Sequence, residues 1–281
     1  MSLPAETSIG AVALTVSDLE TVEAFYRETI GLQAGERTED GVLLGAVPGR
    51  PLVELVSSPG AAPRPPRTTG LFHLALLVPG RAALGGALHR LAAHGARLSG
   101  ASDHLVSEAL YLADPEGNGI EIYRDRPREE WQREGDGIRM ATLPLDLEGV
   151  LAAAGETPEA IEPQTVIGHV HLNVADLEAS ERFYAGMLGF DVTSRGYPGA
   201  LFVSAGGYHH HVGLNTWNGA GAPPAPAGAR GLASFEIRVP ENGGAAAIAE
   251  RLRASGAPVD DTDGALLTTD PSGNALRLRA G

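Results

Sequence analysis

Residues 167–174, IGHVHLNV, carry two histidines at alternate positions, His169 and His171. Apolar residues alternate with them, which predicts a β-strand, and residues 175–184 have the spacing of an amphipathic helix. The same layout occurs at residues 9–26, IGAVALTVSDLETVEAFY, where alanines replace both histidines. The chain is therefore an internal duplication in which one copy carries ligand-type residues and the other does not.

The duplication extends over most of the 281 residues. Three pairs of segments match in the same order, at offsets of 158, 161 and 156 residues: 9–32 with 167–190, 78–96 with 239–257, and 114–118 with 270–274. Repeats that keep their order and spacing indicate two copies of one fold. We predict two tandem halves, residues 8–125 and 166–281, joined by a linker over residues 126–165.

Composition limits the possible functions. Apolar residues make up 43% of the chain and charged residues 20%, as in globular domains, and the net charge of −14 disfavours nucleic acid and anionic membranes as partners. The absence of cysteine excludes disulfides, thiolate nucleophiles and cysteine-ligated metals, so any metal must be held by histidine and carboxylate. The first residues, MSLPAETS, do not resemble a signal peptide, and no segment has the length of a membrane span, which favours a cytoplasmic protein.

Each half contains the same order of predicted elements twice. In the first half, strands are predicted at 9–16, 42–47, 52–57, 71–78, 105–112 and 119–123, and helices at 19–30 and 82–94. Asp18 stands at the N-cap of the first helix, and Gly31 ends that helix. Residues 114–118, DPEGN, have the composition of a turn between the last two strands. The second half repeats this order, so the fold class is α+β.

Alternation predicts which side chains point away from the core. His73, Glu121 and His169 each lie on the non-core face of a predicted strand, at equivalent places in the repeat, whereas Phe72 is expected to face the core. Two imidazoles and one carboxylate with open positions form the ligand set of non-haem Fe(II) oxygenases, and Mn²⁺ also suits the set. A lone histidine or glutamate on a strand is more often exposed or hydrogen-bonded, so spacing alone leaves that alternative open.

Two longer motifs carry a resemblance to a known family. Residues 167–190, IGHVHLNVADLEASERFYAGMLGF, and residues 111–123, YLADPEGNGIEIY, resemble the vicinal oxygen chelate superfamily. This superfamily includes glyoxalase I, extradiol ring-cleavage dioxygenases, and the fosfomycin and bleomycin resistance proteins. The resemblance implies βαβββ modules, paired into curled mixed sheets around a metal. It covers nearly the whole chain as four modules, roughly residues 8–58, 70–125, 166–218 and 231–280.

Two runs resemble the bacillar-type catechol 2,3-dioxygenases in particular. They are residues 103–127, DHLVSEALYLADPEGNGIEIYRDRP, and residues 206–217, GGYHHHVGLNTW. This resemblance implies a non-haem Fe(II) extradiol dioxygenase that opens a catechol-like aromatic ring with O₂. It would act on a small molecule, with neither nucleic acid nor membrane as a partner, and we expect a homo-oligomer.

The family's functional residues carry over to particular positions. His73 and His169 fit the ligands on the first strands of modules two and three, and Glu121 fits the carboxylate on the last strand of module two. Tyr111, ten residues before Glu121, matches an active-site tyrosine of extradiol enzymes. His104 lies near the position of an active-site histidine, although its spacing to Tyr111 is not identical.

Modules one and four depart from the ligand pattern. Ala11 and Ser234 occupy their first-strand positions, and Arg277 stands where a carboxylate belongs in module four. Neither half alone is complete, because only modules two and three together supply two histidines and a glutamate. We therefore predict that modules two and three pair around the metal, within a chain or across a dimer, and that modules one and four pair as a metal-free scaffold.

The triple His209-His210-His211 is predicted to lie on the last strand of module three. On a strand, His209 and His211 would share one face and His210 would take the other. His211 is then a candidate fourth ligand, and His209 a candidate catalytic base.

Two other functions stay open at this point. A glyoxalase-type isomerase or thiol transferase would need a fourth protein ligand, such as His211, and would prefer Ni²⁺ or Zn²⁺. A metal-free binding protein of the bleomycin-resistance type would keep the cavity without a metal, but the complete His/His/Glu set argues against it.

Overall fold

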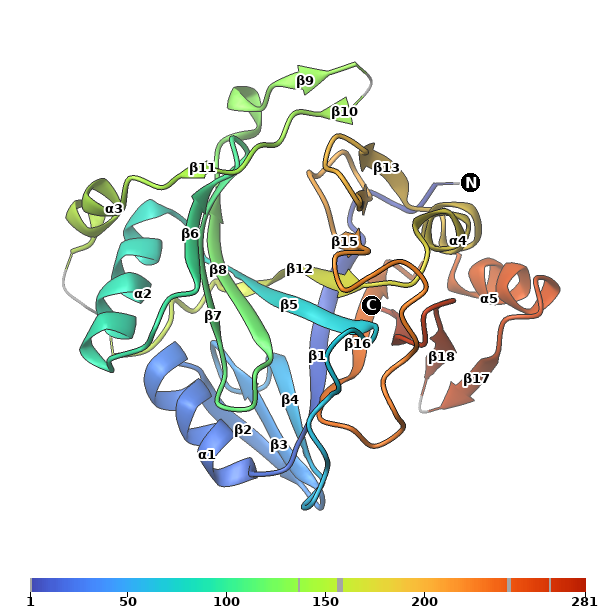
Figure 1. Ribbon diagram of the computed structural model, residues 1–281, viewed down its shortest axis with the longest axis horizontal. Helices are drawn as coiled ribbons and strands as arrows, with labels where there is room; N and C mark the ends of the chain where they lie inside the picture. Colours follow the sequence, from blue (N-terminus) through green and yellow to red (C-terminus); the bar gives the residue numbers. More distant parts are fainter. Residues whose placement is uncertain (1, 136, 156–158, 242–243, 263) are drawn as a thin grey trace.

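The computed structural model describes residues 2–135, 137–155, 159–241, 244–262 and 264–281. Within this part of the chain, two curled sheets lie side by side, and each takes one module from each half (Figure 1). Modules two and three form a nine-stranded sheet in the order β11-β6-β7-β8-β5-β12-β15-β14-β13. Modules four and one form an eight-stranded sheet in the order β17-β18-β19-β16-β1-β4-β3-β2. The predicted pairing of modules two with three and one with four is confirmed, and it occurs within a single chain.

The first half supplies modules one and two. Module one comprises β1 (Ser8–Val16), α1 (Leu19–Ala24), η1 (Phe25–Ile30), β2 (Gln33–Thr38), β3 (Gly41–Gly45) and β4 (Pro51–Ser57). Module two comprises β5 (Gly70–Leu77), α2 (Arg81–Ala93), β6 (Gly100–Asp103), β7 (Ser107–Ala113) and β8 (Gly119–Asp125). The α+β class and the βαβββ order are as predicted.

The second half repeats this order. Module three comprises β12 (Val166–Asn173), α4 (Leu177–Glu181), η3 (Arg182–Leu188), β13 (Asp191–Ser194), β14 (Ala200–Ser204) and β15 (Val212–Asn215). Module four comprises β16 (Gly231–Val239), α5 (Ala245–Ala254), β17 (Val259–Thr262), β18 (Ala265–Thr269) and β19 (Ala275–Ala280). None of the helices in the described ranges is long and apolar enough to cross a membrane.

Strands β2 and β6 were not predicted from the sequence. β2 is QAGERT and is almost wholly exposed, and β6 is GASD. Neither strand has the apolar alternation that identifies a half-buried strand, because β2 is an edge strand and β6 is covered only by the two-residue β11.

The first helix begins as its sequence predicts. The Asp18 side chain accepts a hydrogen bond from the backbone N–H of Thr21, and Gly31 ends the helix with φ 88°. The last turn differs from the prediction, because residues 25–30 form a π-helix, as do the equivalent residues 182–188. Tyr26 lies in the first of these π-helices and is fully buried.

The DPxGN turns hold the two modules of each half together. In the first turn, Asp114 accepts hydrogen bonds from the backbone of Glu116 and Asn118, and in the second Asp270 does the same for its own turn. The Tyr184 hydroxyl donates to Asp270 Oδ2 at 3.0 Å, which ties the module three π-helix to the module four turn. Side chains therefore connect the two modules within a half, whereas each sheet is built from one module of each half.

Glu116 makes the corresponding link in the first half. Its carboxylate accepts hydrogen bonds from the backbone N–H and hydroxyl of Ser17 and from the N–H of Asp18, at 2.7 to 3.0 Å. Arg230, the residue before β16 in the second half, lies 3.6 Å from the same carboxylate. One side chain thus joins the module two turn to the end of β1 and to the other half of the chain.

The linker contains β9 (Arg133–Glu134), β10 (Gly137–Ile138), β11 (Leu143–Pro144), η2 (Arg128–Glu130) and α3 (Leu147–Ala153). Its first part, residues 126–135 and 137–146, is called the linker strap below. At one end β11 pairs with β6, and β10 contacts β13 at the opposite edge of the same sheet. Figure 1 shows the linker strap running across the open side of the curled nine-stranded sheet.

Replacing Glu116 by alanine should destabilise the protein by about 2–3 kcal/mol, because several donors lose a charged acceptor at once. The free energy of unfolding in urea measures this. Glu39→Ala, which removes a carboxylate from an exposed position in the β2–β3 turn, is the matched control and should change stability by less than about 0.5 kcal/mol. Equal effects of the two substitutions would contradict the role assigned to Glu116.

Candidate metal centre and its cavity

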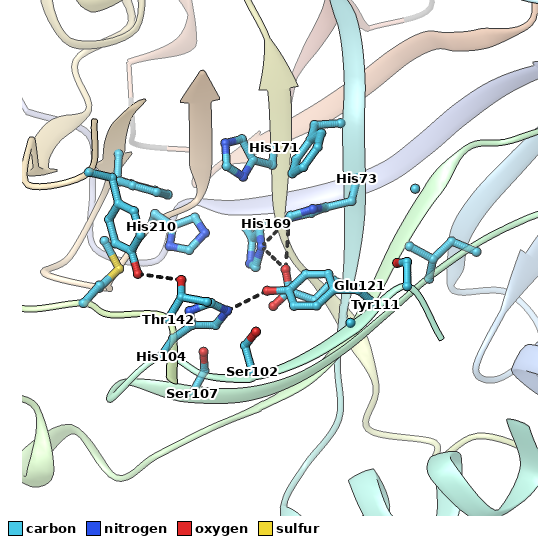
Figure 2. Close-up of a pocket in the computed structure, with 18 of the residues that line it drawn as sticks. His73, Ser102, His104, Ser107, Tyr111, Glu121, Thr142, His169, His171 and His210 are labelled. Atoms are coloured by element: carbon cyan, nitrogen blue, oxygen red, sulfur yellow. Dashed lines mark hydrogen bonds and ion pairs between the residues drawn. The ribbon is translucent and has the colours of Figure 1, made fainter. Parts of the chain in front are cut away.

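The central strands of the nine-stranded sheet bring three ligand-type side chains together. β5 pairs with β12 antiparallel and with β8 in parallel, so these strands lie side by side. His73 comes from β5, Glu121 from β8 and His169 from β12, and all three side chains project to the concave face (Figure 2). Residues 96 positions apart in the chain thus become neighbours.

The three groups converge on one point. Glu121 Oε2 lies 2.9 Å from His73 Nε2 and 3.1 Å from His169 Nε2, and the two Nε2 atoms are 3.4 Å apart. Ligands on one face of an octahedron, with bonds of about 2.1 Å, lie about 3 Å apart. All three residues are at least 94% buried, and they form a candidate metal-binding group among the described residues.

The protonation states of the group suit a divalent metal. Burial lowers the pKa of His169 to about 4, so this imidazole is neutral at neutral pH. Burial alone would raise the pKa of the Glu121 carboxyl, but the imidazoles of His169 and His73 hold it well below its usual value. A neutral imidazole and an ionised carboxylate are the forms that bind metal, so the residues present fit a divalent cation.

The group opens into a cavity of about 460 Å³. This volume lies in the usual range for small-molecule sites. Figure 2 shows His171 on one side of the group, and His104, Ser102 and Ser107 on the other. The linker strap contributes Met140 and Thr142, so the predicted linker also forms part of the wall.

Tyr111 and His104 form a hydrogen-bonded pair beside Glu121. His104 Nδ1 lies 2.7 Å from the Ala141 carbonyl, which can only accept, so Nδ1 carries a proton. His104 Nε2 lies 2.7 Å from the Tyr111 hydroxyl. Burial, with the charge of Glu121, raises the pKa of Tyr111 well above its usual value, so the side chain stays a neutral phenol. The structure thus places both residues in the cavity wall, as predicted from the resemblance.

The histidine triple differs from its prediction. Residues 208–211 form a loop after Gly206 and Gly207, both with positive φ, and β15 begins only at Val212. Strand alternation therefore does not apply, and of the three histidines it is His210 that lines the cavity, 4.1 Å from His169 between ring centroids. The two adjacent glycines are the feature of the sequence from which a turn could have been predicted here.

His211 and His209 point elsewhere. His211 Nδ1 accepts a hydrogen bond from the Ala205 N–H, and its ring lies against Tyr208, so the structure does not place it as a fourth ligand. His209 Nε2 lies 2.9 Å from Asp125 Oδ1. Its contact with the cavity is indirect, because its Nδ1 lies 2.8 Å from Nδ1 of His210.

Phe72 also contradicts its prediction. The β5–β12 register shifts between His73 and Leu71, so Phe72 is an extra residue in a β-bulge. Its side chain lines the cavity and is 41% exposed, instead of facing the core. Periodicity in the sequence carries no signal for this bulge.

Module three has a glycine at the position of Glu121. In module three, Gly213 on β15 lies opposite His171 on β12. This matches module two, where Glu121 on β8 lies opposite Ala75 on β5. A Cβ on Gly213 would lie 2.9 Å from Cγ of His171, so the histidine ring fills the space of a second carboxylate. The group thus offers three candidate ligands and faces the cavity on its other side.

The other sheet holds an ion pair at the equivalent place. In module one, Glu54 lies opposite Ala13, and in module four, Arg277 lies opposite Glu236. Both correspond to the position of Glu121 opposite Ala75 in module two. Arg277 Nη1 lies 3.0 Å from Glu54 Oε2. With Ala11 and Ser234 in place of the histidines, a guanidinium supplies the positive charge there.

The fold and this group define the class of protein. A family model described as the Glyoxalase/Bleomycin resistance protein/Dioxygenase superfamily matches residues 8–122 and 166–278. The chain belongs to this superfamily, and the resemblance inferred from its motifs is confirmed.

Particular relatives extend this result. The catechol-2,3-dioxygenase of Bacillus subtilis (strain 168) is 44% identical over 279 residues, which cover 98% of this chain and 97% of that protein. Glyoxalase I from Zea mays matches 98% of this chain and 92% of its own chain, with a TM-score of 0.59 and 16% identity. The cppA protein from Streptococcus pneumoniae TIGR4 matches 98% of this chain and 99% of its own, with a TM-score of 0.60 and 13% identity. The two structural likenesses show the fold alone.

Stability of the metal-free protein should fall as the pH is lowered from about 6.5. Burial lowers the pKa of His211 to about 3, below the ordinary value of 6.5, so between these values the unfolded chain binds the extra proton. His211 alone should therefore remove about 1.4 kcal/mol per pH unit in this window. Urea unfolding at pH 7, 6 and 5 measures the slope. His211→Asn keeps an acceptor for the Ala205 N–H but does not titrate, and it should flatten the slope by that amount. An unchanged slope would contradict the assignment.

Proposed function

We propose that this protein is an extradiol dioxygenase that binds Fe(II) through His73, His169 and Glu121 and opens a catechol-like ring with O₂. The observation that carries the proposal is the convergence of these three buried ligand atoms within 4.8 Å of one another, in an open cavity. Its 44% identity to a catechol-2,3-dioxygenase over nearly the whole chain supports the same activity. Mn²⁺ is the alternative metal, since the ligand set suits both ions.

The ligand count favours this function over the glyoxalase-type alternative. A closed site with four protein ligands would need a further group, but Gly213 stands at the second carboxylate position and His211 is turned away. A metal held by His73, His169 and Glu121 alone would keep positions free for exogenous ligands, as ring opening with O₂ requires. The metal-free binding alternative leaves the buried Glu121 carboxylate without a cation.

The reaction balances without an external reductant. Both atoms of O₂ enter the product, one carbon–carbon bond of the ring beside a hydroxylated carbon breaks, and the electrons that reduce O₂ come from the ring. A bound Fe(II) or Mn²⁺ would supply a Lewis acid and a path for electrons between the ring and O₂. The remaining requirements, proton transfer and orientation, fall to residues of this chain.

His104 and Tyr111 are placed to handle a proton on one side of the cavity. With Nδ1–H donated to the Ala141 carbonyl, neutral His104 accepts from the Tyr111 hydroxyl through Nε2. A proton received by His104 reverses this bond, and the Tyr111 hydroxyl can then donate to an oxygen of the substrate. The pair is therefore a candidate general acid and its orienting partner.

His210 is the candidate base on the other side. Its ring lies against His169 in the cavity wall, and burial holds its pKa well below the usual value, so the ring is neutral and has one unprotonated nitrogen. His209 connects it to Asp125, so the predicted role of His209 becomes indirect. We propose that His210 accepts the proton of a catechol hydroxyl.

Metal content tests the ligand set directly. Protein purified without oxygen and loaded with Fe(II) should contain about one metal per chain, and His73→Ala and Glu121→Ala should each lose at least tenfold in metal affinity together with O₂ uptake on catechol. Glu54→Ala is the matched control, because Glu54 occupies the equivalent place in the other sheet and should leave both properties intact. Metal retained by both ligand variants would place the site elsewhere.

Tyr111→Phe should lower kcat for ring opening by about 100-fold and keep the metal, since it removes one proton-donating hydroxyl without touching a ligand. Stopped-flow measurement of product formation, with elemental analysis of the same sample, checks both parts. A loss of metal would show that the hydroxyl acts by orienting Glu121, and an unchanged kcat would remove Tyr111 from the mechanism.

A further inference from the structure

Three aromatic side chains form one wall of the cavity, and they are called the aromatic rim here: Phe72, His171 and Trp217. Their ring centroids lie 5.2, 5.3 and 5.4 Å apart, and two of the three contacts are edge-to-face. Phe72 is 41% exposed and Trp217 is 48% exposed, although both belong to the wall of a cavity. Large apolar side chains exposed at a concave site mark a surface that a ligand covers.

The chain positions Phe72 by an irregularity in the sheet. The β-bulge opposite His171 turns Phe72 away from the core and toward the cavity, next to the ligand His73. Regular strand geometry would place this phenylalanine against the core with Leu74. β-bulges near active sites commonly redirect a side chain in this way.

Trp217 is held in place despite its exposure. Its Nε1–H donates to the Pro198 carbonyl at 3.0 Å, and its backbone N–H donates to Asn215 Oδ1 at 3.0 Å. Gly199 lies beside the indole and has φ +70°, a backbone conformation that favours glycine. The indole therefore offers a fixed apolar face and loses little freedom when a ligand covers it.

The cavity offers a ligand no positive side chain. The chain has no lysine, and none of its 21 arginines is among the described residues that line the cavity. Arg67 shares a separate surface hollow with Trp217, and Arg195 pairs with Glu181. Among the described residues that line the cavity, Glu121 is the one with a carboxylate. A second carboxylate, brought in on a substrate, would be desolvated without a partner.

We propose that the aromatic rim binds an uncharged, apolar substituent of the ring substrate, so that the enzyme selects alkyl- or aryl-substituted catechols over carboxylated ones. This inference rests on the proposed function and names the substrate class of the same site. Phe72 and Trp217 are its specificity-determining residues. A metal held by His73, Glu121 and His169 would orient the two hydroxyl groups, and the rim would then select what the rest of the ring carries.

The first test is a substrate series on the iron-loaded enzyme. It compares catechol with 3-methyl-, 4-methyl- and 4-ethylcatechol, and with 3,4-dihydroxybenzoate. Each added methylene that contacts the rim should raise kcat/KM about fourfold in at least one ring position. The carboxylated ring should be at least about tenfold poorer than catechol. Equal use of the carboxylated and methylated rings would overturn the proposal.

Variants locate the preference. Phe72→Ala and Trp217→Ala should each reduce the rise in kcat/KM per added methylene to less than twofold, mainly by raising KM for the alkylated rings. Their effect on kcat for unsubstituted catechol should be much smaller. Trp217→Arg should improve 3,4-dihydroxybenzoate relative to catechol about tenfold, a gain that misfolding cannot produce. Leu147→Ala removes an apolar side chain that is 37% exposed outside the cavity, and it should leave the series unchanged. If a rim variant lowered kcat/KM by the same factor for every substrate, the rim would have no selective role.

A binding measurement separates the two proposals. Trp217 and Trp131 are the tryptophans of the chain, so the fluorescence change lost in Trp217→Phe reports on the rim. Without oxygen, 4-ethylphenol should quench this signal at lower concentration than phenol, and 4-hydroxybenzoate should fail to do so. If no catechol is turned over but this order holds, the proposed function fails and the apolar preference stands. If catechol is turned over and 4-hydroxybenzoate binds as well as 4-ethylphenol, the rim proposal alone fails.

Discussion

The antiparallel pairing of β5 with β12 is the contact on which the candidate site depends. It joins the two halves of the chain, and its register sets His73 opposite His171 and Ala75 opposite His169. On the other face of these strands, Leu74 and Val170 are fully buried between the two sheets. A slip of one residue would expose that apolar face and turn the imidazoles into the core. The hydrophobic core therefore enforces the register that assembles the ligands.

The internal repeat gives both sheets the same set of register positions, but the two sheets fill these positions differently. In the sheet of modules one and four, Glu54 remains but faces Arg277. A buried or half-buried carboxylate needs a positive partner, and in this sheet a guanidinium supplies it without any metal. In the sheet of modules two and three, Gly213 occupies the position that corresponds to Arg277, and the ring of His171 lies beside it. Among the described residues that line the cavity, no arginine accompanies Glu121. The contrast between the two sheets is the strongest internal argument that Glu121 meets a cation.

Sequence reasoning succeeded where periodicity and the repeat carried the information. The order of strands and helices follows from alternation and the repeat, and the meeting of His73, Glu121 and His169 follows from the family resemblance together with the complementary losses in modules one and four. It failed where the backbone departs from regular geometry. The bulge at Phe72 and the loop that contains His210 interrupt the alternation of the strands. Alternation was the basis for predicting which side chains face the core and which face the cavity. The polar strand β2 also has no apolar pattern, because water covers it.

The linker strap covers part of the open side of the curled sheet. It pairs with β6 at one edge, contacts β13 at the other, and places Thr142 within 3.1 Å of the Tyr197 hydroxyl across the cavity. Its Trp131 packs on His209, next to the cavity histidine His210. Excluding water strengthens each electrostatic interaction of a buried carboxylate with a cation. The segment that joins the two halves in sequence thus also forms part of the wall around candidate ligands that come from both halves.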